Sequence, residues 1–286
     1  MASQAATWAR LRAFVKNACG VVFTDDQEYL LEARLGPVAS DNKYSCVADL
    51  VGAIGTMPPD SVIVRAVIDA MTTHETLFFR DAGYWRTLDE EILPKLSAQL
   101  NRRRMRIWSA ACSNGQEPYS IAMLLEEHWP DLARNTEIIA TDVSAPAVER
   151  ARGGFYNNHE VNRGLASSRL LRHFQQEPGG FRVKQLLRDR IQWSVHNLLS
   201  HWPDPYDCDI VMCRNVLIYF SDTDRSTVLH RIEAAARPGG MIGLGCTETS
   251  PRKQLVPGWY EKPGYESVQA PAGTLSWGPS RGNVDR

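Results

Sequence analysis

Residues 109–120 read SAACSNGQEPYS. This stretch closes the apolar run RIWSAA and opens the helical pattern PYSIAMLLEEHW, so it is the turn of a predicted strand–turn–helix unit. Gly115 supplies the freedom in φ that a tight turn requires. Glu117 lies where the helix dipole favours a carboxylate, and Pro118 suits the first helical position because no N–H is needed there. Taken alone, the stretch is consistent with a plain turn with an acidic cap or with a turn that binds a ligand.

The chain downstream of this turn alternates between short apolar runs and helical patterns. TEIIATDV, YDCDIVMCRN and GGMIGLGC have the character of strands, and APAVERAR and DTDRSTVLHRIEAAAR have that of helices. This alternation predicts an α/β fold with a parallel sheet covered by helices on both faces. A β-rich stretch at about residues 177–194 interrupts the order and predicts a small inserted β subdomain there.

Upstream of the sheet, the chain contains four helical patterns, which are ATWARLRAFVKNAC, DQEYLLEARL, CVADLVGAI and SVIVRAVIDAM. Gly36-Pro37 is expected to end the second of them. We therefore expect a small helical N-terminal domain over residues 1–76 and a sheet domain over residues 77–270. Residues 271–286 are rich in Gly, Pro and Ser and are expected to form a loose tail.

The composition favours a globular protein and argues against a membrane-spanning or an exported one. The 286 residues are 43% hydrophobic and 23% charged, as in globular domains, and a formal net charge of −1 gives no reason to expect tight non-specific binding to nucleic acid. No apolar stretch is long enough to span a bilayer, and the segment MASQAATWARLRAF lacks the apolar core of an export signal, which indicates a cytoplasmic protein without membrane insertion. None of the six cysteines forms a CxxC pair, so we expect free thiols and no metal site.

Polar residues follow the predicted strands, at the edge where ligands bind in an open α/β sheet. Asp142 lies at the end of TEIIATDV, where a carboxylate can accept both hydroxyls of a ribose or cap the following helix. Together with Glu117 it favours a nucleoside ligand that carries an amino group. Arg214 and Asn215 end DIVMCRN, and Tyr219 follows one helical turn later, as a site residue or as a core aromatic.

Two further stretches have open interpretations. In TTHETLFFRD, residues 72–81, Phe78 and Phe79 are expected in the core, and Arg80 is either a solvated cap or a cation held in the cleft. HNLL, residues 196–199, gives a polar pair after the apolar run IQWSV. No nucleophile–base pair of the His–Ser or Cys–His kind is evident in these motifs.

Five stretches in this order resemble the CheR-type chemoreceptor glutamate methyltransferases: TTHETLFFRD, IWSAACSNGQEPYSIAM, ATDVS, NLL and MCRNVLIYF. The resemblance implies a Rossmann-like class I methyltransferase sheet with a small helical N-terminal domain. It implies transfer of a methyl group from S-adenosylmethionine (SAM) to glutamate side-chain carboxylates of chemoreceptors, with S-adenosylhomocysteine (SAH) as the product. The implied partner is the cytoplasmic domain of a chemoreceptor, and the implied process is sensory adaptation.

The resemblance also implies roles for residues of this chain. Arg80 would lie near the transferred methyl group and Tyr219 beside the substrate carboxylate, as orienting donors. The implied cofactor contacts are Thr76 and Arg80 at the site lining, Ala111 and Glu117 at the methionine moiety, Asp142 at the ribose, Asn197 and Leu198 around the adenine, and Arg214 and Asn215 in the inner wall. Because a glutamate with a pKa of about 4.3 is already ionised at pH 7, no general base is required.

The sequence departs from the family pattern at several positions. Asn114 and Gln116 stand where the family has Thr and Glu, and His74 replaces a more usual Asn. The second helix, which is often strongly basic in members that act on receptors, offers only Arg34 and Lys43. The short loop in QQEPGGFRV is similar to that of members that do not bind a tethering C-terminal peptide of the receptor.

Two other classes of function stay open. One is a signalling module that binds SAM or SAH without transferring a methyl group, which Asn114, Gln116 and the weakly basic second helix motivate. The other is a methyltransferase for nucleic acid or a small molecule. Amino-methylating nucleic-acid enzymes of this fold usually carry a D/N-P-P-Y-like sequence where this chain reads CRNVLIYF, and no basic, aromatic-lined face is apparent. We therefore expect no nucleic-acid partner.

Overall fold

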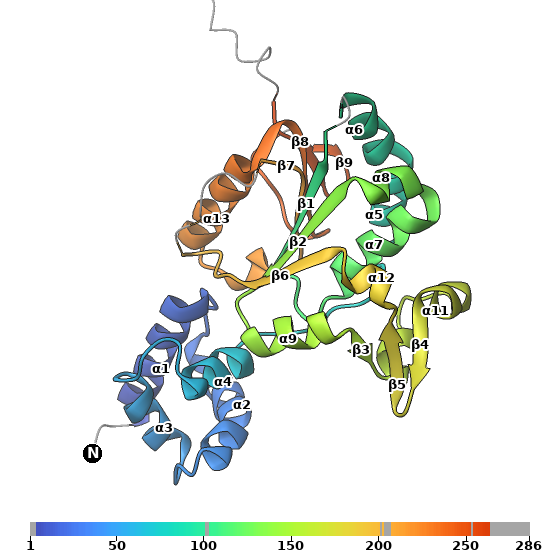
Figure 1. Ribbon diagram of the computed structural model, residues 1–286. Helices are drawn as coiled ribbons and strands as arrows, with labels where there is room; N and C mark the ends of the chain where they lie inside the picture. Colours follow the sequence, from blue (N-terminus) through green and yellow to red (C-terminus); the bar gives the residue numbers. More distant parts are fainter. Residues whose placement is uncertain (1–3, 101–102, 201, 203–206, 253, 264–286) are drawn as a thin grey trace, which may run out of the picture.

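The computed structural model of the chain describes residues 4–100, 103–200, 202, 207–252 and 254–263. A bundle of helices at the N-terminal end lies against one end of a central sheet, and a small antiparallel sheet projects from one side (Figure 1). The predicted α/β fold with N-terminal helices and a small β subdomain is confirmed.

The N-terminal bundle forms an apolar core of its own. Its helices are α1 (Gln4–Cys19), the 3-10 turn η1 (Asp25–Gln27), α2 (Glu28–Asp41), α3 (Val47–Ile54) and α4 (Val62–Met71). Leu11, Leu31 and Leu50 are fully buried where α1, α2 and α3 meet. The four helical patterns of the sequence therefore correspond to the four α-helices of one bundle.

The sequence predicted that the second helix ends at Gly36-Pro37. In the structure, α2 continues past this pair to Asp41. Proline in a helix removes one N–H donor, so the local sequence favours a stop. Leu35 and Ala39 are buried on either side of Pro37, and their burial keeps the last turn of the helix in place. Tertiary packing thus overrides a local signal at this point.

The segment 72–81, which we call the strap, joins the bundle to the sheet domain. It is followed by α5 (Ala82–Thr87), the π-helical turn η2 (Leu88–Ile92) and α6 (Leu93–Gln99). Trp85, Leu88 and Leu93 are buried in the core of the sheet domain. The sequence pattern did not identify these short helices.

The main sheet has the strand order β6-β2-β1-β7-β8-β10-β9. Its strands are β1 (Met105–Ala110), β2 (Thr136–Asp142), β6 (Ile191–Val195), β7 (Cys208–Cys213), β8 (Ala236–Leu244), β9 (Gln254–Val256) and β10 (Trp259–Glu261). The first five pair in parallel, whereas β9 and β10 form an antiparallel edge. From β1 the chain first builds one side of the sheet, through β2 and β6, and then the other, through β7 and β8. The carboxyl ends of β1 and β7 therefore flank a switch point, where open α/β sheets bind ligands.

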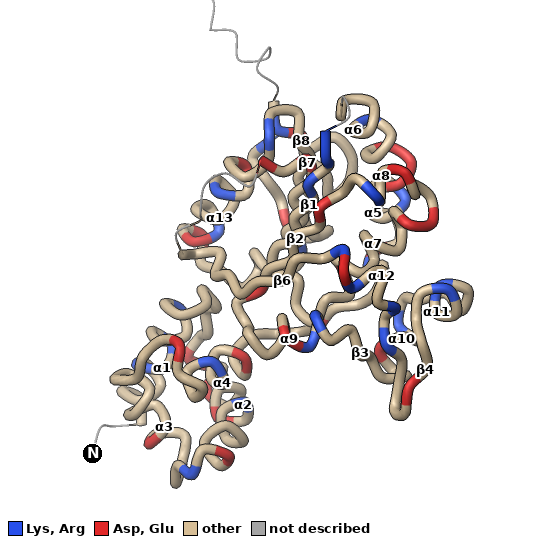
Figure 2. The backbone as a smooth tube through the Cα atoms, in the orientation of Figure 1, with Lys and Arg blue, Asp and Glu red and all other residues tan. Residues whose placement is uncertain are grey.

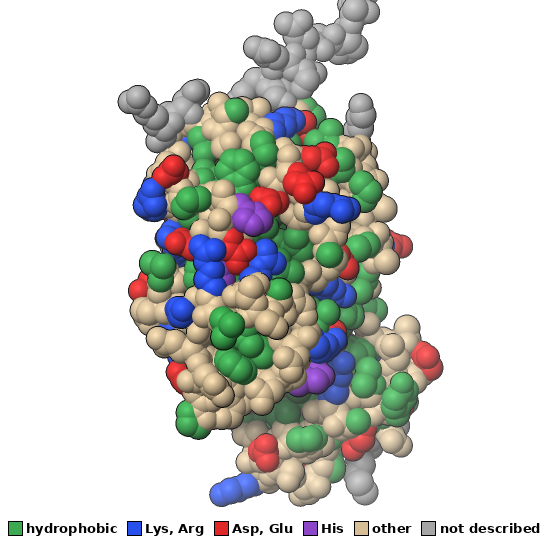
Figure 3. Space-filling view, turned by 90° about the vertical axis from the view of Figure 1, so that its right-hand side faces the viewer, with side chains coloured by type: hydrophobic (Ala, Val, Ile, Leu, Met, Phe, Trp, Pro, Cys, Tyr) green, Lys and Arg blue, Asp and Glu red, His purple; other side chains and the backbone are tan. Residues whose placement is uncertain are grey.

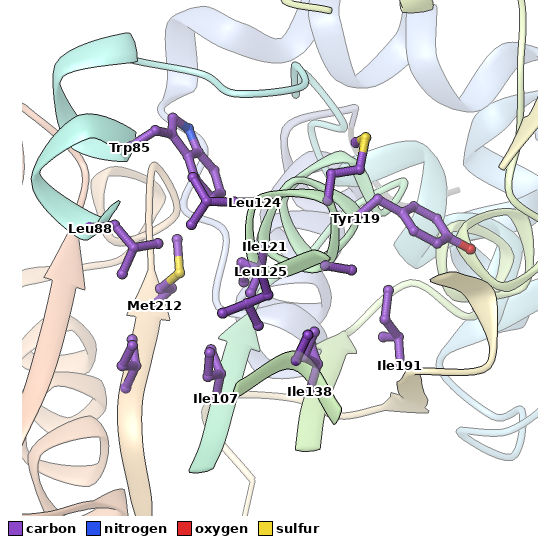
Figure 4. Packing of buried hydrophobic residues seen from close by; sticks show 14 of the residues in the cluster. Trp85, Leu88, Ile107, Tyr119, Ile121, Leu124, Leu125, Ile138, Ile191 and Met212 are labelled. Atoms are coloured by element: carbon purple, nitrogen blue, oxygen red, sulfur yellow. The ribbon is translucent and has the colours of Figure 1, made fainter. Parts of the chain in front are cut away.

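Helices cover both faces of this sheet. They are α7 (Gln116–His128), α8 (Pro130–Arg134), α9 (Ala145–Gly153) and α13 (Asp222–Ala235), with the 3-10 turn η3 (Leu217–Tyr219) after β7. Ile107 and Met212 point toward Ile121 and Leu124 of α7 (Figure 4). Their neighbour Trp108 belongs to the core cluster on the α13 side. Successive residues of a strand point to opposite faces, so one apolar run supplies both layers.

A small three-stranded sheet forms the core of what we call the β subdomain, residues 155–183. Its strands are β3 (Phe155–Tyr156), β5 (Gly180–Val183) and β4 (Phe174–Glu177), in this spatial order, and its helices are α10 (Asn158–Asn162) and α11 (Ser167–His173). The sequence predicted this subdomain at residues 177–194. Compared with the observed range, the prediction begins too late, because it omits β3 and most of β4, and ends too late, because it includes most of β6 of the main sheet. Strand β3 is too short to show an alternating pattern, and after α12 (Gln185–Arg188) the run IQWSV pairs with β2 in the main sheet.

None of the described helices combines the length and the apolar composition needed to cross a bilayer. The six cysteines carry free thiols. On the face shown in Figure 3, acidic and basic side chains lie next to one another, as the small net charge of the chain suggests. The expected tail, 271–286, lies outside the described residues.

Gly115 has a φ of 91°, as the turn prediction requires. A Cβ at this position would lie 2.7 Å from Cβ of Ala151 and 3.0 Å from the ring of Trp193. The glycine therefore lets the start of α7 lie close to α9 and β6. Helix α7 begins at Gln116, so Pro118 is its third residue and not its first, but it still falls within the turn whose N–H groups lack helical partners.

We predict that Gly115→Ala destabilises the protein by about 2–5 kcal/mol, from the strain of a positive φ and the contact with Ala151. Gly52→Ala in α3 is the matched control, because no atom lies within 4 Å of the added Cβ and alanine favours a helix by roughly 0.5–1 kcal/mol. Urea unfolding measures both variants. Equal unfolding midpoints would contradict the packing argument.

Candidate active site

A pocket lies at the carboxyl ends of β1, β2, β6 and β7 and is bounded by the N-terminal bundle. Cys19 and Val21 contribute the bundle's side, and Thr72 begins the strap's side. The site residues predicted from the sequence all line this pocket: Thr76, Arg80, Ala111, Glu117, Asp142, Asn197, Leu198, Arg214, Asn215 and Tyr219. The fold thus brings together residues from the ends of four strands, β1, β2, β6 and β7, and from the strap.

The backbone around the pocket is strained. Ala111, Ser113 and Asn215 have φ values of 57°, 51° and 59°, which residues with a Cβ rarely adopt. Each such residue costs on the order of 1–3 kcal/mol, and such residues gather at ligand sites. They lie directly after β1 and β7, so the strain is located at the switch point of the sheet.

Asp142 ends β2 and accepts hydrogen bonds from N–H of Ser113 at 2.8 Å and of Ser144 at 2.9 Å. Burial raises the pKa of Asp142 although these two donors oppose the shift. Each carboxylate oxygen has a second lone pair, so the group is stabilised by further donors. The buried hydroxyl of Ser113 also lacks a partner within the described residues. The two hydroxyls of a ribose fit this donor-poor carboxylate.

Glu117 lies in the first turn of α7 and shares its carboxylate between two partners. Its Oε1 accepts from Ser109 Oγ at 2.7 Å, and its Oε2 pairs with Arg214 at 3.0 Å. Arg214 also pairs with Asp81 at 2.7 Å and lies 4.0 Å from the ring centroid of Tyr84. One guanidinium thus faces two carboxylates, so the cluster keeps a net negative charge that suits a ligand ammonium or sulfonium.

Arg80 differs from Arg214 in its partners. Its Nη1 donates to the carbonyl of Glu75 at 3.2 Å, and it makes no ion pair with the described residues. Its own carbonyl is held by Trp85 Nε1 at 2.8 Å and by Arg214 at 3.0 Å. The backbone of Arg80 is therefore fixed, and its charge is available to an anion in the pocket.

The N-terminal bundle contacts two of the predicted site residues directly. Asn197 donates its side-chain amide to the carbonyl of Ala18 at 2.8 Å, and the carbonyl of Tyr219 accepts from Val22 N–H at 3.0 Å. Leu198 is buried beside Asn197 and offers an apolar surface to the pocket. The side chain of Asn197 thus joins the two domains, which the sequence did not indicate.

Glu248, which sequence reasoning missed, holds the two loops after β7 and β8. Its buried carboxylate accepts from N–H of Asn215 and Leu217 at 2.7 Å each, and from N–H of Gly245 at 2.8 Å. The loop after β7 carries Asn215 and leads into Tyr219. An acidic residue two positions after the apolar run GGMIGLGC is the signal that could have identified it.

A second missed group lies where the bundle meets the sheet domain. Asp69 of α4 pairs with His74 of the strap at 3.0 Å and accepts from the hydroxyl of Ser144. Burial opposes the imidazolium, but the hydrogen bond to Asp69 and the charges of Asp142 and Asp69 raise the pKa of His74. The hydrogen bond from His74 lowers the pKa of Asp69. This pair connects Asp142, through Ser144, with the N-terminal bundle.

The parallel sheet and this pocket define a protein with a Rossmann-like class I methyltransferase fold. Residues 74–260 match the family described as CheR methyltransferase, SAM binding domain. The chain belongs to this family. Among the described residues, no group of His, Cys, Asp or Glu is arranged to hold a metal ion, and the donor set of the pocket suits SAM.

Three relatives illustrate the extent of the similarity. Chemotaxis protein methyltransferase 1 of Pseudomonas aeruginosa is 37% identical over 253 residues, covering 87% of this chain and 92% of the relative. Chemotaxis protein methyltransferase Cher2 of Pseudomonas putida is 36% identical, covering 84% and 88%. Chemotaxis protein methyltransferase 1 of Vibrio cholerae is 38% identical, covering 82% and 86%. The similarity therefore extends over most of each chain.

We predict that Glu248→Gln lowers the free energy of unfolding by about 1–3 kcal/mol, because the amide NH₂ would face backbone N–H donors in a buried site. Glu261→Gln on β10 is the matched control, since its pair with Lys95 is partly exposed and is worth about 0–1 kcal/mol. Chemical denaturation compares the two variants. A Glu248 variant as stable as the control would contradict the role of this carboxylate.

We predict that His74→Asn destabilises the protein more in mildly acidic than in alkaline solution. The raised pKa means that the folded protein binds the proton of His74 more tightly than the unfolded chain, so this stabilisation is complete below pH of about 6.5 and is lost as pH rises through the folded value. Thermal midpoints from about pH 5.5 to 9 measure the effect, with His159→Asn on the exposed part of α10 as control. A difference between wild type and His74→Asn that is independent of pH would contradict it.

Proposed function

We propose that this protein transfers a methyl group from SAM to glutamate side-chain carboxylates of chemoreceptors, giving glutamate methyl esters. The observation that carries this proposal is the charge pattern of one pocket. A net negative cluster around Glu117 suits a cationic methyl donor, and Arg80, which has no carboxylate partner among the described residues, suits an acidic acceptor.

The residues that would hold SAM come from separate strand ends. Asp142 would accept from the ribose hydroxyls, Glu117 would face the ammonium group, and Leu198 would lie beside the adenine. Thr76, Ala111, Asn197, Arg214 and Asn215 would complete the cofactor wall. When bound, SAM supplies a methyl group on a positively charged sulfur, which is electrophilic without any help from the protein.

The chain's own residues then need to position an acceptor that is already a nucleophile. A glutamate is ionised at pH 7, so no base takes a proton. Arg80 would pair with one carboxylate oxygen and Tyr219 would donate its hydroxyl, which leaves the other oxygen free to attack. Alignment of this kind contributes about 7–11 kcal/mol to barrier lowering. A methyl ester is neutral, so Arg80 attracts the product less than the substrate, which favours release.

We propose the cytoplasmic domain of a chemoreceptor as the partner and the cytoplasm as the location. Within α2, Arg34 is the only basic residue, and it donates to the carbonyl of Met71 and to Thr73 Oγ1 at 3.2 Å each. Figure 2 accordingly shows no cluster of Lys and Arg on α2. The turn between β4 and β5 consists of Pro178 and Gly179, and so short a hairpin supports recognition without a tethering receptor peptide.

We predict that Arg80→Met lowers kcat by about 100-fold, because the acceptor carboxylate loses its orienting cation. The affinity for SAH, measured by calorimetry, is expected to change less than about twofold, because Arg80 faces the acceptor and not the nucleoside. Arg86→Met on the exposed side of α5 is the matched control. The assay uses methyl-labelled SAM with receptor membranes and counts base-labile methanol.

Each outcome bears on a different part of the proposal. Full activity of Arg80→Met would show that Arg80 does not orient the acceptor. Label recovered on nucleic acid would show that the acceptor is nucleic acid and not a receptor glutamate. A wild type that binds SAH but transfers no methyl group to any receptor would favour the signalling module.

A further inference from the structure

The strap holds Arg80 between two residues with a left-handed backbone. Phe79 has a φ of 49° and Asp81 a φ of 65°. A positive φ costs about 1 kcal/mol or more for a residue with a Cβ. Contacts from outside the strap are therefore needed to keep Phe79 and Asp81 in this backbone conformation. The β subdomain supplies several of these contacts.

The ring of Phe79 lies between two side chains. The guanidinium carbon of Arg169, on helix α11 of the β subdomain, lies 3.8 Å from its centroid, and Trp85 meets it edge to face at 5.2 Å. N–H of Phe79 donates to Ser120 Oγ at 3.0 Å. Both the ring and the backbone of the residue directly before Arg80 are therefore fixed.

Arg169 is itself held firmly. It donates to both oxygens of Glu127 on α7, at 2.9 Å and 3.2 Å. His173 contacts the same carboxylate at 2.8 Å. Burial opposes ionisation of this carboxyl, but His173 and Arg169 lower the pKa of Glu127 to about 2. The carboxylate thus remains charged, and it orients the flat face of Arg169 onto Phe79.

The β subdomain also contacts the residue before Phe79. The ring of Phe78 meets Tyr156 edge to face at 4.9 Å and Phe174 at 5.7 Å. The backbone of Gly164 approaches so closely that a Cβ would lie 1.9 Å from the carbonyl oxygen of Phe78. Both aromatic residues of the strap therefore rest on this subdomain.

A separate contact reaches the turn after β1. Tyr156 donates its hydroxyl to the carbonyl of Asn114 at 2.6 Å, and both groups are buried. Asn114 follows Ser113, whose N–H binds Asp142. The β subdomain thus contacts both the segment that carries Arg80 and the segment that faces the nucleoside.

We propose that the β subdomain braces the active site through two separate residues: Arg169 positions Arg80 through Phe79, and Tyr156 positions the turn after β1 through Asn114. This role is independent of any peptide bound at the short β4–β5 hairpin. The first half of the inference rests on the proposed function of Arg80, whereas the second half concerns binding of the nucleoside.

The test measures kcat for methyl ester formation and the Kd of SAH for two variants, with turnover expressed per SAH-binding site so that misfolded protein is not counted. Arg169→Met is expected to lower kcat roughly tenfold with SAH affinity unchanged within about twofold. Tyr156→Phe is expected to weaken SAH binding severalfold. Its kcat at saturating SAM is expected to change by a smaller factor than its affinity for SAH. Arg172→Met, on the exposed side of the same helix, is the matched control and is expected to match the wild type.

Wild-type kcat per site in Arg169→Met, or wild-type SAH affinity in Tyr156→Phe, would overturn the corresponding half of the inference. A fall in kcat and SAH affinity by the same factor in both variants would indicate general destabilisation and would overturn both halves. A wild type that forms no methyl ester would instead contradict the proposed function. The effect of Tyr156→Phe on SAH binding would still test the brace in that case.

Discussion

The pocket depends on the buried guanidinium of Arg214. This one group pairs with Glu117 at the start of α7 and with Asp81 at the end of the strap, and its side chain is only 3% exposed. Removing one partner of a buried ion pair leaves an uncompensated charge and costs several kcal/mol, typically about 3–5. The ends of β7, α7 and the strap are therefore fixed relative to one another. The face of the guanidinium rests on Tyr84, which stacks on Trp259 of the antiparallel edge at 4.4 Å.

The second constraint is that the pocket needs both domains. Asn197 reaches Ala18 of the bundle, and Asp69 of the bundle reaches His74 and Ser144. A hydrophobic interface alone would allow the domains to slide, whereas these directional bonds define one position. One side of the pocket is thus completed by a part of the chain that has no strand and no methyltransferase motif.

Charge divides the pocket into two functional sides. Around Glu117 two carboxylates outnumber one guanidinium, and at the strap Arg80 stands without a carboxylate partner among the described residues. A cationic donor and an anionic acceptor are therefore attracted to different sides of one space. The strained backbone at Ala111 and Asn215 places these groups where a relaxed turn would not. Buried groups such as Glu248 compensate for part of that strain, because they hold the loops that contain it.

The sequence by itself determined the class of fold and part of the lining of the pocket. Strand–helix alternation specifies a parallel sheet, and in such a sheet the residues after each strand meet at one edge, so Glu117, Asp142 and Arg214 could be placed together without knowing their contacts. Only the tertiary structure decided which groups hold the segments around the pocket in place. Glu248 and Arg169 act on residues that lie far away in the chain, and local periodicity contains no information about such partners. The physical reason is that hydrophobic patterning fixes which side of an element is buried, whereas directional bonds depend on distances that exist only after the elements have packed.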